Sequence, residues 1–447
     1  MHSPSQEKGV VDRLPIIYLP VEFRSREFDS KALLATVLAV RGYSVMIGRQ
    51  WSITNNLRRL RPGVMLFKSF NAIHHEAMRK ARSTGQIVMV LEEELLAHME
   101  KKAIGNFCVR GMFDLPDLIL ANGDFEKEAL TEFSEGRAKI EVTGNGRVDL
   151  LKLKYRSFFQ KDVDAIRARF GDFILVNTNF ALTNTQWPSI DDVTRINVEA
   201  GFVRLDDPAS VQAWRDQIEF EQLNSAAMLK VIAELSRRRP KQKIVVRPHP
   251  GEALERWNGV FSQFPNVSVV REGAHVPWTL ASKLLIHTSC TTGFEAQAAG
   301  KVALSLVAKP NWISQSFISN HLNPFYTDPM KMVLAVERYL VRDKAPAPQT
   351  MTDPNYYIWN FTDRNAVEKT ADVLTRDLPP PADMVLSQEA LPVPPLSESV
   401  IAKFSMSAHE CADVLQRLTA THTPGFDLSL AEVAESVFMV GPKVKAA

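Results

Sequence analysis

Three glutamates stand together directly after a short apolar run of strand length. The run covers residues 86–91, and Glu92, Glu93 and Glu94 follow it. Crowded carboxylates raise one another's pKa, and a carboxylate with a raised pKa can take the proton of an attacking hydroxyl. An acidic first turn that stabilises a helix dipole would have the same composition. We predict that one of the three is a general base, with Glu93 the first choice.

A second motif, Arg247-Pro248-His249-Pro250, closes the apolar run 243–247. Two prolines fix the backbone, so Arg247 and His249 are expected to point out of the strand end. A guanidinium binds phosphate oxygens with two N–H groups, and an imidazole donates one more. A strand end with a purely structural role, in which the histidine caps a neighbouring loop, would have the same sequence. We predict that Arg247, His249 and Pro250 contact a monophosphate or diphosphate.

A third motif consists of small and hydroxylated residues, 287–293, between the apolar run 284–286 and a predicted helix. A helix N-terminus offers N–H groups and a positive dipole end, which suit a phosphate. Glu295 lies on the first turn, where its carboxylate could reach a ribose diol. A capping box of Thr292 and Glu295 is the structural alternative. We predict nucleotide-sugar contacts from His287, Ser289, Thr291, Thr292 and Glu295.

Weaker signals lie at the ends of three other predicted strands. Asn177 and Asn179 end or follow the run 173–177, where amides hold a sugar or a base edge, or close a turn. We predict that they contact the same nucleotide sugar. The polar residues Glu22, Arg24 and Arg49 follow early strands, and we predict that they contact an acceptor.

Strand-length apolar runs alternate with helix-length segments, which predicts parallel, doubly wound sheets with ligands at the carboxyl ends of the strands. The runs are 14–21, 43–48, 64–67, 86–91, 118–121 and 140–142, then 173–177, 243–247, 267–270, 284–286 and 302–307. The predicted fold class is α/β, with two Rossmann-like domains facing a cleft. Residues 1–165 would form an acceptor domain and 166–345 a nucleotide-sugar domain. Residues 346–447, with the Pro-rich segment 377–395, would form a linker and C-terminal extension.

The charge, cysteine content and apolar runs of the chain exclude several classes of protein function. The 447 residues carry 53 basic and 51 acidic side chains, a net charge of +2 that gives no whole-chain attraction to nucleic acid. Cys108, Cys290 and Cys411 are far apart, which fits a reducing cytosol rather than disulfides or a zinc site. No apolar run reaches the 18 residues of a membrane span. We expect a cytoplasmic protein without metal or cofactor, and the basic runs 58–61 and 237–243 leave room for a peripheral membrane or glycan-assembly contact.

Several segments together resemble the bacterial surface polysaccharide biosynthesis protein family over about residues 14–345. They are IIYLPVEFRSREFDSKALLA, LEEE, GNGRVDLL, FILVNTNFALTN, IVVRPHPGE and PWTLASKLLIHTSCTTGFEAQAAGK. The second half is also similar to GT-B transferases that use CMP-activated acidic sugars, the polysialyltransferases and capsular Kdo transferases. His249-Pro250 and the stretch 289–292 match the residues that grip CMP in those enzymes. Glu93-Glu94 matches their acidic pair, but Leu95 replaces the expected glycine, which leaves the base open among the three glutamates.

The resemblance implies a metal-independent glycosyltransferase of surface-polysaccharide assembly. Its donor would be a nucleotide sugar such as CMP-Kdo or a CMP-nonulosonate, and its acceptor a hydroxyl of a glycan or lipid-linked glycan. Three alternatives stay open: a nucleotide-sugar 2-epimerase, a polyol-phosphate transferase with a CDP-linked donor, and a non-catalytic scaffold of a glycan export complex. The epimerase would need more carboxylates at the nucleotide site than Glu295 alone.

Overall fold

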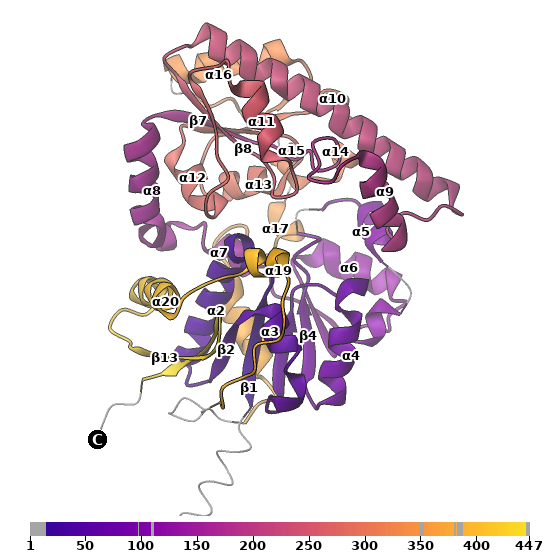
Figure 1. The fold of residues 1–447 in the computed structure, drawn as a ribbon, viewed down its shortest axis with the longest axis vertical. Helices are drawn as coiled ribbons and strands as arrows, with labels where there is room; N and C mark the ends of the chain where they lie inside the picture. The colour runs from indigo at the N-terminus through magenta and orange to yellow at the C-terminus, as the bar shows by residue number, and fades with distance from the viewer. Residues whose placement is uncertain are drawn as a thin grey trace, which may run out of the picture. The chain divides into compact units, whose positions relative to one another are not determined.

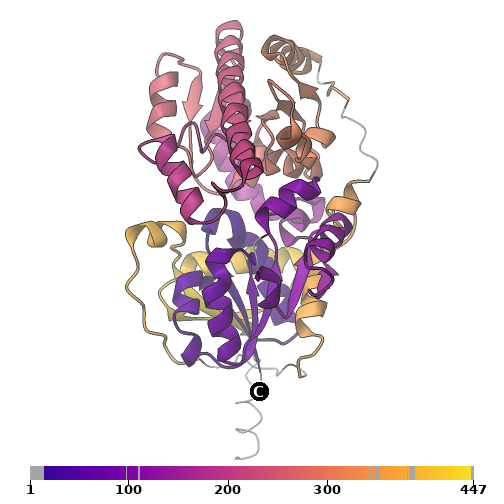
Figure 2. The same cartoon turned by 90° about the vertical axis from the view of Figure 1, so that its right-hand side faces the viewer.

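The computed structural model describes residues 15–96, 98–108, 111–342, 344–347, 353–379, 381 and 388–443. The chain divides into two compact units, each built on its own sheet (Figures 1 and 2). Unit 1 contains Met1–Leu96, Cys108–Phe158 and Asn355–Ala447, and unit 2 contains Ala97–Phe107 and Phe159–Pro354. The fold is therefore of the predicted α/β class, with two Rossmann-like units.

Unit 1 is built on an eight-stranded sheet in the order β13-β14-β2-β1-β3-β4-β5-β6. The strands are β1 (Ile16–Val21), β2 (Val45–Arg49), β3 (Gly63–Phe67), β4 (Ile87–Leu91), β5 (Leu118–Ala121), β6 (Ile140–Val142), β13 (Leu428–Ala434) and β14 (Val437–Pro442). Strands β1 to β6 are parallel. Parallel strands are covered by helices on both faces, which explains why β1 is buried along its whole length and reads as a continuous apolar run.

The helices of unit 1 connect its strands or belong to the C-terminal segment. They are α2 (Asp29–Val40), α3 (Gln50–Thr54), α4 (His75–Ser83), α6 (Asp124–Phe133), α7 (Gly146–Asp149), α17 (Pro354–Tyr357), α18 (Ala366–Thr375), α19 (Glu398–Lys403) and α20 (Ala408–His422); α8 (Arg156–Phe170) runs from unit 1 into unit 2. Gly42, with φ of 90°, follows the end of α2, where a left-handed residue commonly terminates a helix. Helix α2 continues directly from a π-helical turn, and the Ser30 hydroxyl donates to the Glu27 carbonyl.

Unit 2 is built on a six-stranded parallel sheet in the order β12-β11-β10-β7-β8-β9. Its strands are β7 (Phe173–Asn177), β8 (Lys243–Arg247), β9 (Val267–Val269), β10 (Leu284–His287), β11 (Ala303–Leu306) and β12 (Phe325–Tyr326). Its helices are α5 (Lys101–Phe107), α9 (Ile190–Glu199), α10 (Pro208–Arg238), α11 (Leu254–Phe261), α12 (His275–Ala281), α13 (Thr291–Ala298), α14 (Trp312–Gln315), α15 (Ile318–Leu322) and α16 (Pro329–Arg342). The long helix α10 buries Met228, Val231, Ile232 and Leu235 against this sheet.

Each sheet has one point where the strand order reverses. In unit 1 the chain passes from β2 back across β1 to β3, and in unit 2 it passes from β9 back to β10 beside β7. At such a point neighbouring loops leave the sheet in opposite directions, and ligands of open α/β sheets bind there, at the carboxyl ends of the strands. The topology therefore directs attention to the residues that follow β1 and β3 in unit 1, and β7 and β10 in unit 2.

The C-terminal segment belongs to unit 1, which differs from the predicted separate extension 346–447. Strand β14 pairs antiparallel with β2, and helix α20 packs on α2. The hairpin β13–β14 thereby covers the edge of β2 that would otherwise expose unpaired backbone groups. Of the Pro-rich segment 377–395, residues 380 and 382–387 lie outside the described residues, and residues 388–395 form neither helix nor strand. Residue 14, the first of the predicted first strand, also lies outside the described residues.

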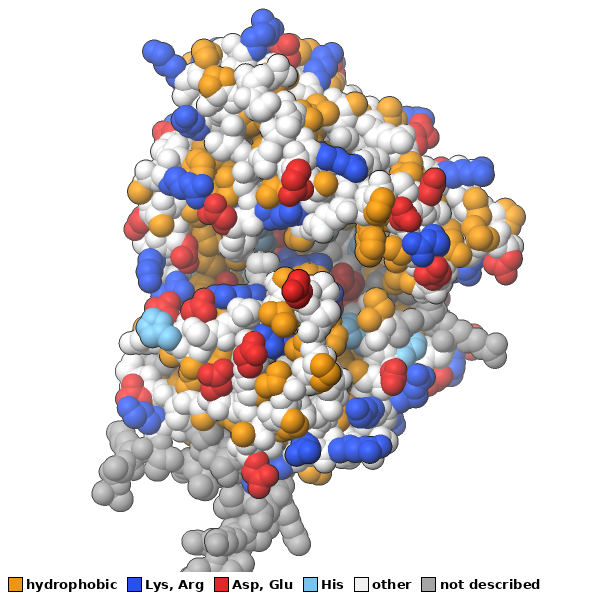
Figure 3. Space-filling model, viewed as in Figure 1, with side chains coloured by type: hydrophobic (Ala, Val, Ile, Leu, Met, Phe, Trp, Pro, Cys, Tyr) orange, Lys and Arg blue, Asp and Glu red, His pale blue; other side chains and the backbone are white. Residues whose placement is uncertain are grey.

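No helix in the described ranges combines the length and apolarity that crossing a membrane requires. Figure 3 shows Lys and Arg side chains scattered over the viewed face among acidic and apolar ones. Two of the arginines in the basic run 237–243 pair with one carboxylate, since Arg238 and Arg239 both contact Glu337 at 2.7 and 3.2 Å. These pairs reduce the positive charge that this run would offer to an anionic surface.

Candidate functional site

The strand reversal of unit 2 brings two predicted motifs together. Strand β7 pairs with β10 over residues 174–176 and 284–286, so the loops after both strands start at the same edge of the sheet. The Asn179 side-chain amide donates to the Ser289 carbonyl at 3.4 Å, which joins the two loops directly. Asn177, at the end of β7, is 5% exposed, and its Oδ1 accepts no hydrogen bond from any described residue.

His249 has one ring nitrogen fixed by its own loop. The Gly251 backbone N–H donates to His249 Nδ1 at 3.1 Å, and the ring is partly exposed. Because Nδ1 accepts, a neutral His249 carries its proton on Nε2. The loop therefore orients the imidazole as an N–H donor, which is the form that a phosphate oxygen requires.

Glu252 is the central residue of this loop, and the sequence reasoning missed it. Its carboxylate is fully buried and accepts hydrogen bonds from five donors. They are the Thr178 hydroxyl, the Phe180 and His249 backbone N–H groups, the Asn184 amide and the Trp257 indole. One carboxylate thus holds the loop after β7 to the loop after β8. The glutamate in RPHPGE, two residues after a proline-fixed turn, was the available signal.

Arg247 has a different role from the predicted phosphate contact. Its guanidinium donates to the Glu272 and Gly273 carbonyls at 2.7 and 3.1 Å and lies 4.7 Å from the centre of the Trp278 ring. Burial lowers the pKa of Arg247 to about 10. The Arg247 side chain therefore fixes the loop before α12. Pro250, the third residue predicted to contact phosphate, is exposed beside His249.

The turn before α13 contains a residue with a left-handed backbone conformation. Ser289 has a φ of 41°, the left-handed region that non-glycine residues rarely adopt, and it is 1% exposed. The Asn320 amide donates to its hydroxyl at 2.8 Å and holds that conformation. Helix α13 then starts at Thr291, and its N-cap residue Cys290 makes no side-chain capping hydrogen bond. Thr291 and Thr292 are partly exposed at this N-terminus, where backbone N–H groups favour an anion.

His287 lies beneath this turn instead of facing a ligand, which corrects its predicted contact. The ring is fully buried, and burial lowers its pKa to about 3, so it is neutral. Its Nε2 lies 3.2 Å from the Asn323 amide. A Cβ at Gly293 would lie 2.3 Å from that Nε2, so only glycine allows α13 to pack this closely on His287.

Glu295 is buried in α13 and contacts His275 at the start of α12, with 2.7 Å between Oε2 and Nε2. The structural alternative, a capping box of Thr292 and Glu295, is absent, because the helix begins earlier than that pairing requires. The pair joins α13 to α12, and His275 remains partly exposed beside it. A ribose hydroxyl would therefore meet the Glu295–His275 pair rather than an isolated carboxylate.

In unit 1 the three predicted glutamates have three different environments. Glu92 is fully buried and accepts N–H bonds from Phe70 and Glu94, which fixes the turn after β4. Burial raises its pKa well above the usual value. Burial would also raise the pKa of Glu94, but the charges of Arg26 and Lys68 outweigh it and hold that pKa at about 2. Glu94 is therefore a permanent anion.

Glu93 combines the properties expected of a base. Its side chain is 4% exposed, and burial raises its pKa despite the nearby charge of Lys31. Among the hydrogen bonds of the described residues, none ends on its carboxylate. Lys31 is itself tied to Glu27, 3.1 Å away, so part of its charge is already neutralised. Of the three glutamates, Glu93 is the one whose carboxylate has a raised pKa and remains available.

The predicted acceptor residues lie where the C-terminal segment meets the loop after β1. Glu22 is held between Lys68 and Lys403 of α19, both at 2.7 Å. Arg24 is partly exposed and pairs with Glu410 of α20 at 2.8 Å. Arg49 is fully buried and donates to the Phe404 carbonyl at 2.8 Å, so it anchors the C-terminal segment and has no surface for an acceptor.

Another buried carboxyl group, Glu126 on α6, supports the turn that carries the glutamates. Asn122 donates to Glu126 at 2.6 Å and to the Glu92 carbonyl at 2.7 Å. Glu126 Oε1 is buried without a partner among the described residues, and burial raises the pKa of Glu126 from 4.5 to about 8. The folded state therefore prefers the protonated acid.

We expect Glu126→Gln to change how stability depends on pH. The raised folded-state pKa contributes stability below about pH 4.5, and this contribution is lost as the pH rises to about 8. Between pH 5.5 and 8.5 the wild type should lose on the order of a few kcal/mol relative to Glu126→Gln, whose amide cannot ionise. Urea unfolding at several pH values measures the difference. Glu128→Gln, exposed on the same helix, should follow the wild type; parallel curves for all three proteins would refute the assignment.

The described residues contain no group of three or more His, Cys, Asp or Glu side chains arranged to hold a metal ion. Apart from any metal, polar groups gather at the carboxyl ends of β7, β8 and β10: His249, the turn 288–292, the first amides of α13, and the Glu295–His275 pair.

No family model matches the sequence, and no curated protein matches it. Solved structures do match. A UDP-GlcNAc 2-epimerase of Methanocaldococcus jannaschii, in complex with UDP-GlcNAc and UDP, aligns at 13% identity over 81% of this chain and 99% of its own, with a TM-score of 0.51. A UDP-N-acetylglucosamine 2-epimerase of Listeria monocytogenes aligns at 13% identity over 83% and 100%, with a TM-score of 0.50.

The wall teichoic acid polymerase TagF also aligns, at 13% identity over 83% of this chain and 92% of its own, with a TM-score of 0.42. Likeness at these identities concerns the fold and not the reaction. Together with the two parallel sheets, the two epimerase structures show that the chain has a two-domain, Rossmann-like, GT-B-like fold.

Proposed function

We propose that the protein is a glycosyltransferase of surface-glycan assembly that uses a nucleotide-activated sugar. The observation that carries this proposal is the turn at the β7–β10 edge, with Ser289 in the left-handed region in front of an α13 N-terminus that no N-cap side chain occupies. Such a turn aims backbone N–H groups at one point and suits a phosphate. His249 adds an oriented imidazole from the neighbouring loop.

The acid–base group that a transfer needs would come from unit 1. In the proposed reaction the acceptor hydroxyl oxygen attacks the anomeric carbon, and the bond from that carbon to the nucleotide phosphate breaks. The Glu93 carboxylate takes the hydroxyl proton, and the departing phosphate keeps the electron pair of the broken bond. His249 and the α13 amides would then bind the added negative charge on the departing nucleotide.

The proposal also includes the donor substrate and the cellular compartment of the reaction. The sequence resemblance to CMP-dependent transferases makes CMP-Kdo and a CMP-nonulosonate donors to test, and the fold likeness adds UDP-linked sugars. We place the reaction in the cytoplasm, with a hydroxyl of a glycan or lipid-linked glycan as acceptor.

A nucleotide-sugar 2-epimerase is the second candidate, because the nucleotide edge of unit 2 holds more carboxyl groups than the sequence indicated. Glu221 on α10 and Glu252 lie there in addition to Glu295. The Glu252 carboxylate is engaged in its five hydrogen bonds, whereas burial raises the pKa of Glu221 to about 7. A carboxyl group with that pKa can exchange a proton near neutral pH. An epimerase would convert a UDP-sugar without any acceptor, which separates the two candidates.

Isothermal titration with CMP, CDP, UDP and GDP tests the nucleotide site. We expect one nucleotide to bind preferentially and His249→Ala to weaken it by about 1–3 kcal/mol, the value of a hydrogen bond to a charged group. His409→Ala, an exposed histidine of α20 in unit 1, should leave binding unchanged. Failure of all four nucleotides to bind would overturn the proposed site and favour a scaffold role; preference for CDP would favour a polyol-phosphate transferase.

A further inference from the structure

The turn that precedes α13 depends on a residue in an unfavourable backbone conformation. Ser289 is one of three non-glycine residues with a positive φ in the described ranges, and its φ of 41° lies in the left-handed region. A Cβ makes this region costly for residues other than glycine, so a serine stays there only where its surroundings enforce it. Contacts from other segments must therefore hold the turn.

The side chain of Asn320, in α15, supplies such a contact. Its N–H groups donate to the Ser289 hydroxyl at 2.8 Å and to the Ser314 carbonyl at 2.7 Å, and its oxygen accepts from the Ser305 hydroxyl. Because a carbonyl only accepts, the amide nitrogen has to face Ser314, and the same nitrogen then faces Ser289. Asn320 is 5% exposed and thereby ties the turn to α14 and to the end of β11.

A second asparagine holds the start of α13 independently of Asn320. Asn323, directly after α15, is fully buried, and its amide donates to the Gly293 carbonyl at 3.0 Å. The same amide lies 3.2 Å from the His287 ring. Loss of the Asn320 side chain would therefore remove the support of the turn and leave the helix in its place.

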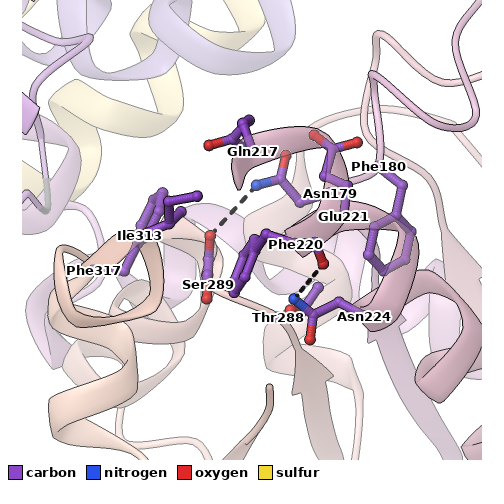
Figure 4. A pocket seen from close by; sticks show the side chains of 10 residues that line it. All are labelled: Asn179, Phe180, Gln217, Phe220, Glu221, Asn224, Thr288, Ser289, Ile313 and Phe317. Atoms are coloured by element: carbon purple, nitrogen blue, oxygen red, sulfur yellow. Dashed lines mark hydrogen bonds between the residues drawn. The ribbon is translucent and has the colours of Figure 1, made fainter. Parts of the chain in front are cut away.

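The Ser289 hydroxyl serves the structure of the turn instead of facing a ligand. Ser289 is 1% exposed, its hydroxyl accepts from Asn320, and its backbone carbonyl accepts from the Asn179 amide at 3.4 Å (dashed in Figure 4). The hydroxyl of the preceding residue, Thr288, has no hydrogen-bond partner among the described residues. Of these two neighbouring hydroxyls, that of Thr288 is the one available to a ligand.

We propose that Asn320 is a positioning residue of the phosphate site, and that Ser289 is needed for its bond to Asn320 and not for a contact between its hydroxyl and the ligand. The inference rests on the proposed function, because it assigns what keeps the turn before α13 ready for a phosphate. Asn320 holds Ser289 in the left-handed region, and that conformation sets the direction of the backbone N–H groups of the turn. A glycine adopts the same conformation without any side-chain contact.

Two replacements of Ser289 distinguish a structural hydroxyl from a ligand hydroxyl. The probe is whichever of CMP, CDP, UDP and GDP the wild type binds most tightly in isothermal titration. We expect Ser289→Ala to weaken its binding about tenfold, since alanine is strained at this φ and gives Asn320 no acceptor. Ser289→Gly should recover at least about fivefold of that loss, because glycine adopts the turn unaided. A hydroxyl that binds the phosphate would be missed equally in both variants.

Asn320→Ala completes the comparison. It should weaken nucleotide binding about tenfold in the wild-type background but less than about threefold in the Ser289→Gly background, where the amide has no strained residue to hold. His321→Ala is the matched control, since this neighbouring α15 residue contacts the Gln315 carbonyl at 2.8 Å, and it should bind as the wild type does. Urea unfolding shows whether each variant is folded. If Asn320→Ala does not fold, the two Ser289 variants decide alone.

The outcomes separate this inference from the proposed function. Equal losses in Ser289→Ala and Ser289→Gly, or wild-type affinity in Ser289→Ala, would overturn the inference and leave the nucleotide site intact. A full effect of Asn320→Ala in the Ser289→Gly background would also overturn it, because Asn320 would then act on something other than Ser289. Absence of binding by all four nucleotides in the wild type would overturn the proposed function and the inference together.

Discussion

Replacement of Glu252 by alanine is expected to lower the free energy of unfolding by at least about 3 kcal/mol. The fully buried carboxylate accepts five hydrogen bonds, two of them from the backbone N–H groups of Phe180 and His249. Alanine leaves all five donors without their acceptor, and each unsatisfied buried donor costs about 1–3 kcal/mol before water enters the space. The loops after β7 and β8 would then lose the carboxylate that joins them, and the His249 backbone N–H would lose its acceptor.

Urea unfolding followed by tryptophan fluorescence measures this effect, because Trp257 donates directly to Glu252. Glu255→Ala is the matched control, since Glu255 is exposed three residues further along the chain. Nucleotide titration of the same variant adds a second readout. If the Glu252→Ala and Glu255→Ala proteins unfold at the same urea concentration, Glu252 does not hold the two loops together.

The sequence predicts the alternating part of this fold well, because a buried parallel strand leaves a continuous apolar run. The predicted bounds 118–121, 140–142, 173–177 and 243–247 agree with β5, β6, β7 and β8 to the residue. The hairpin β13–β14 was not predicted. Its partner β2 is distant in the chain, and β13 includes exposed Ala431 and Glu432, so nothing in the local pattern indicates a sheet.

The sequence predicted where the candidate site lies in the fold, but it did not predict the role of each side chain. A motif after a strand locates a residue at the edge of the sheet, whereas its neighbours decide where the side chain points. Arg247 turns to the Glu272 carbonyl, and His287 lies beside the Asn323 amide, because partners from later segments of the chain meet them there. Glu221 gave no signal at all, since it lies within a long amphipathic helix and gains its importance from the loop of Leu182.

The C-terminal segment shows the same limit in unit 1. Arg49 follows a strand as an acceptor residue would, but its guanidinium is satisfied by Phe404 and Glu435, more than 350 residues later in the chain. Lys403 reaches Glu22 from the same segment. Contacts over such separations depend on how the tail folds back, and a single sequence does not encode that in any local spacing.

Glu93→Gln is expected to reduce the rate of sugar transfer by about 10²–10⁴-fold, the usual contribution of a general base. The amide keeps the shape of the side chain but cannot take a proton. Nucleotide affinity should be unchanged, because the groups proposed to bind it belong to unit 2 and Glu93 to unit 1. The measurement is nucleotide release from the donor in the presence of a glycan acceptor, alongside titration of the nucleotide alone.

Glu94→Gln is the matched comparison, one residue away. Glu94 is already ionised through Arg26 and Lys68, so its loss should weaken the ion pairs of the turn and reduce the rate less than the loss of Glu93. In the wild type the rate should fall on acidification at a pH above the usual glutamate range, since the raised pKa of Glu93 protonates the base early. A larger loss in Glu94→Gln would transfer the role of base to Glu94. Full transfer activity in Glu93→Gln with intact nucleotide binding would remove the base from this turn, because a carboxylate that takes the proton cannot be replaced by an amide without cost.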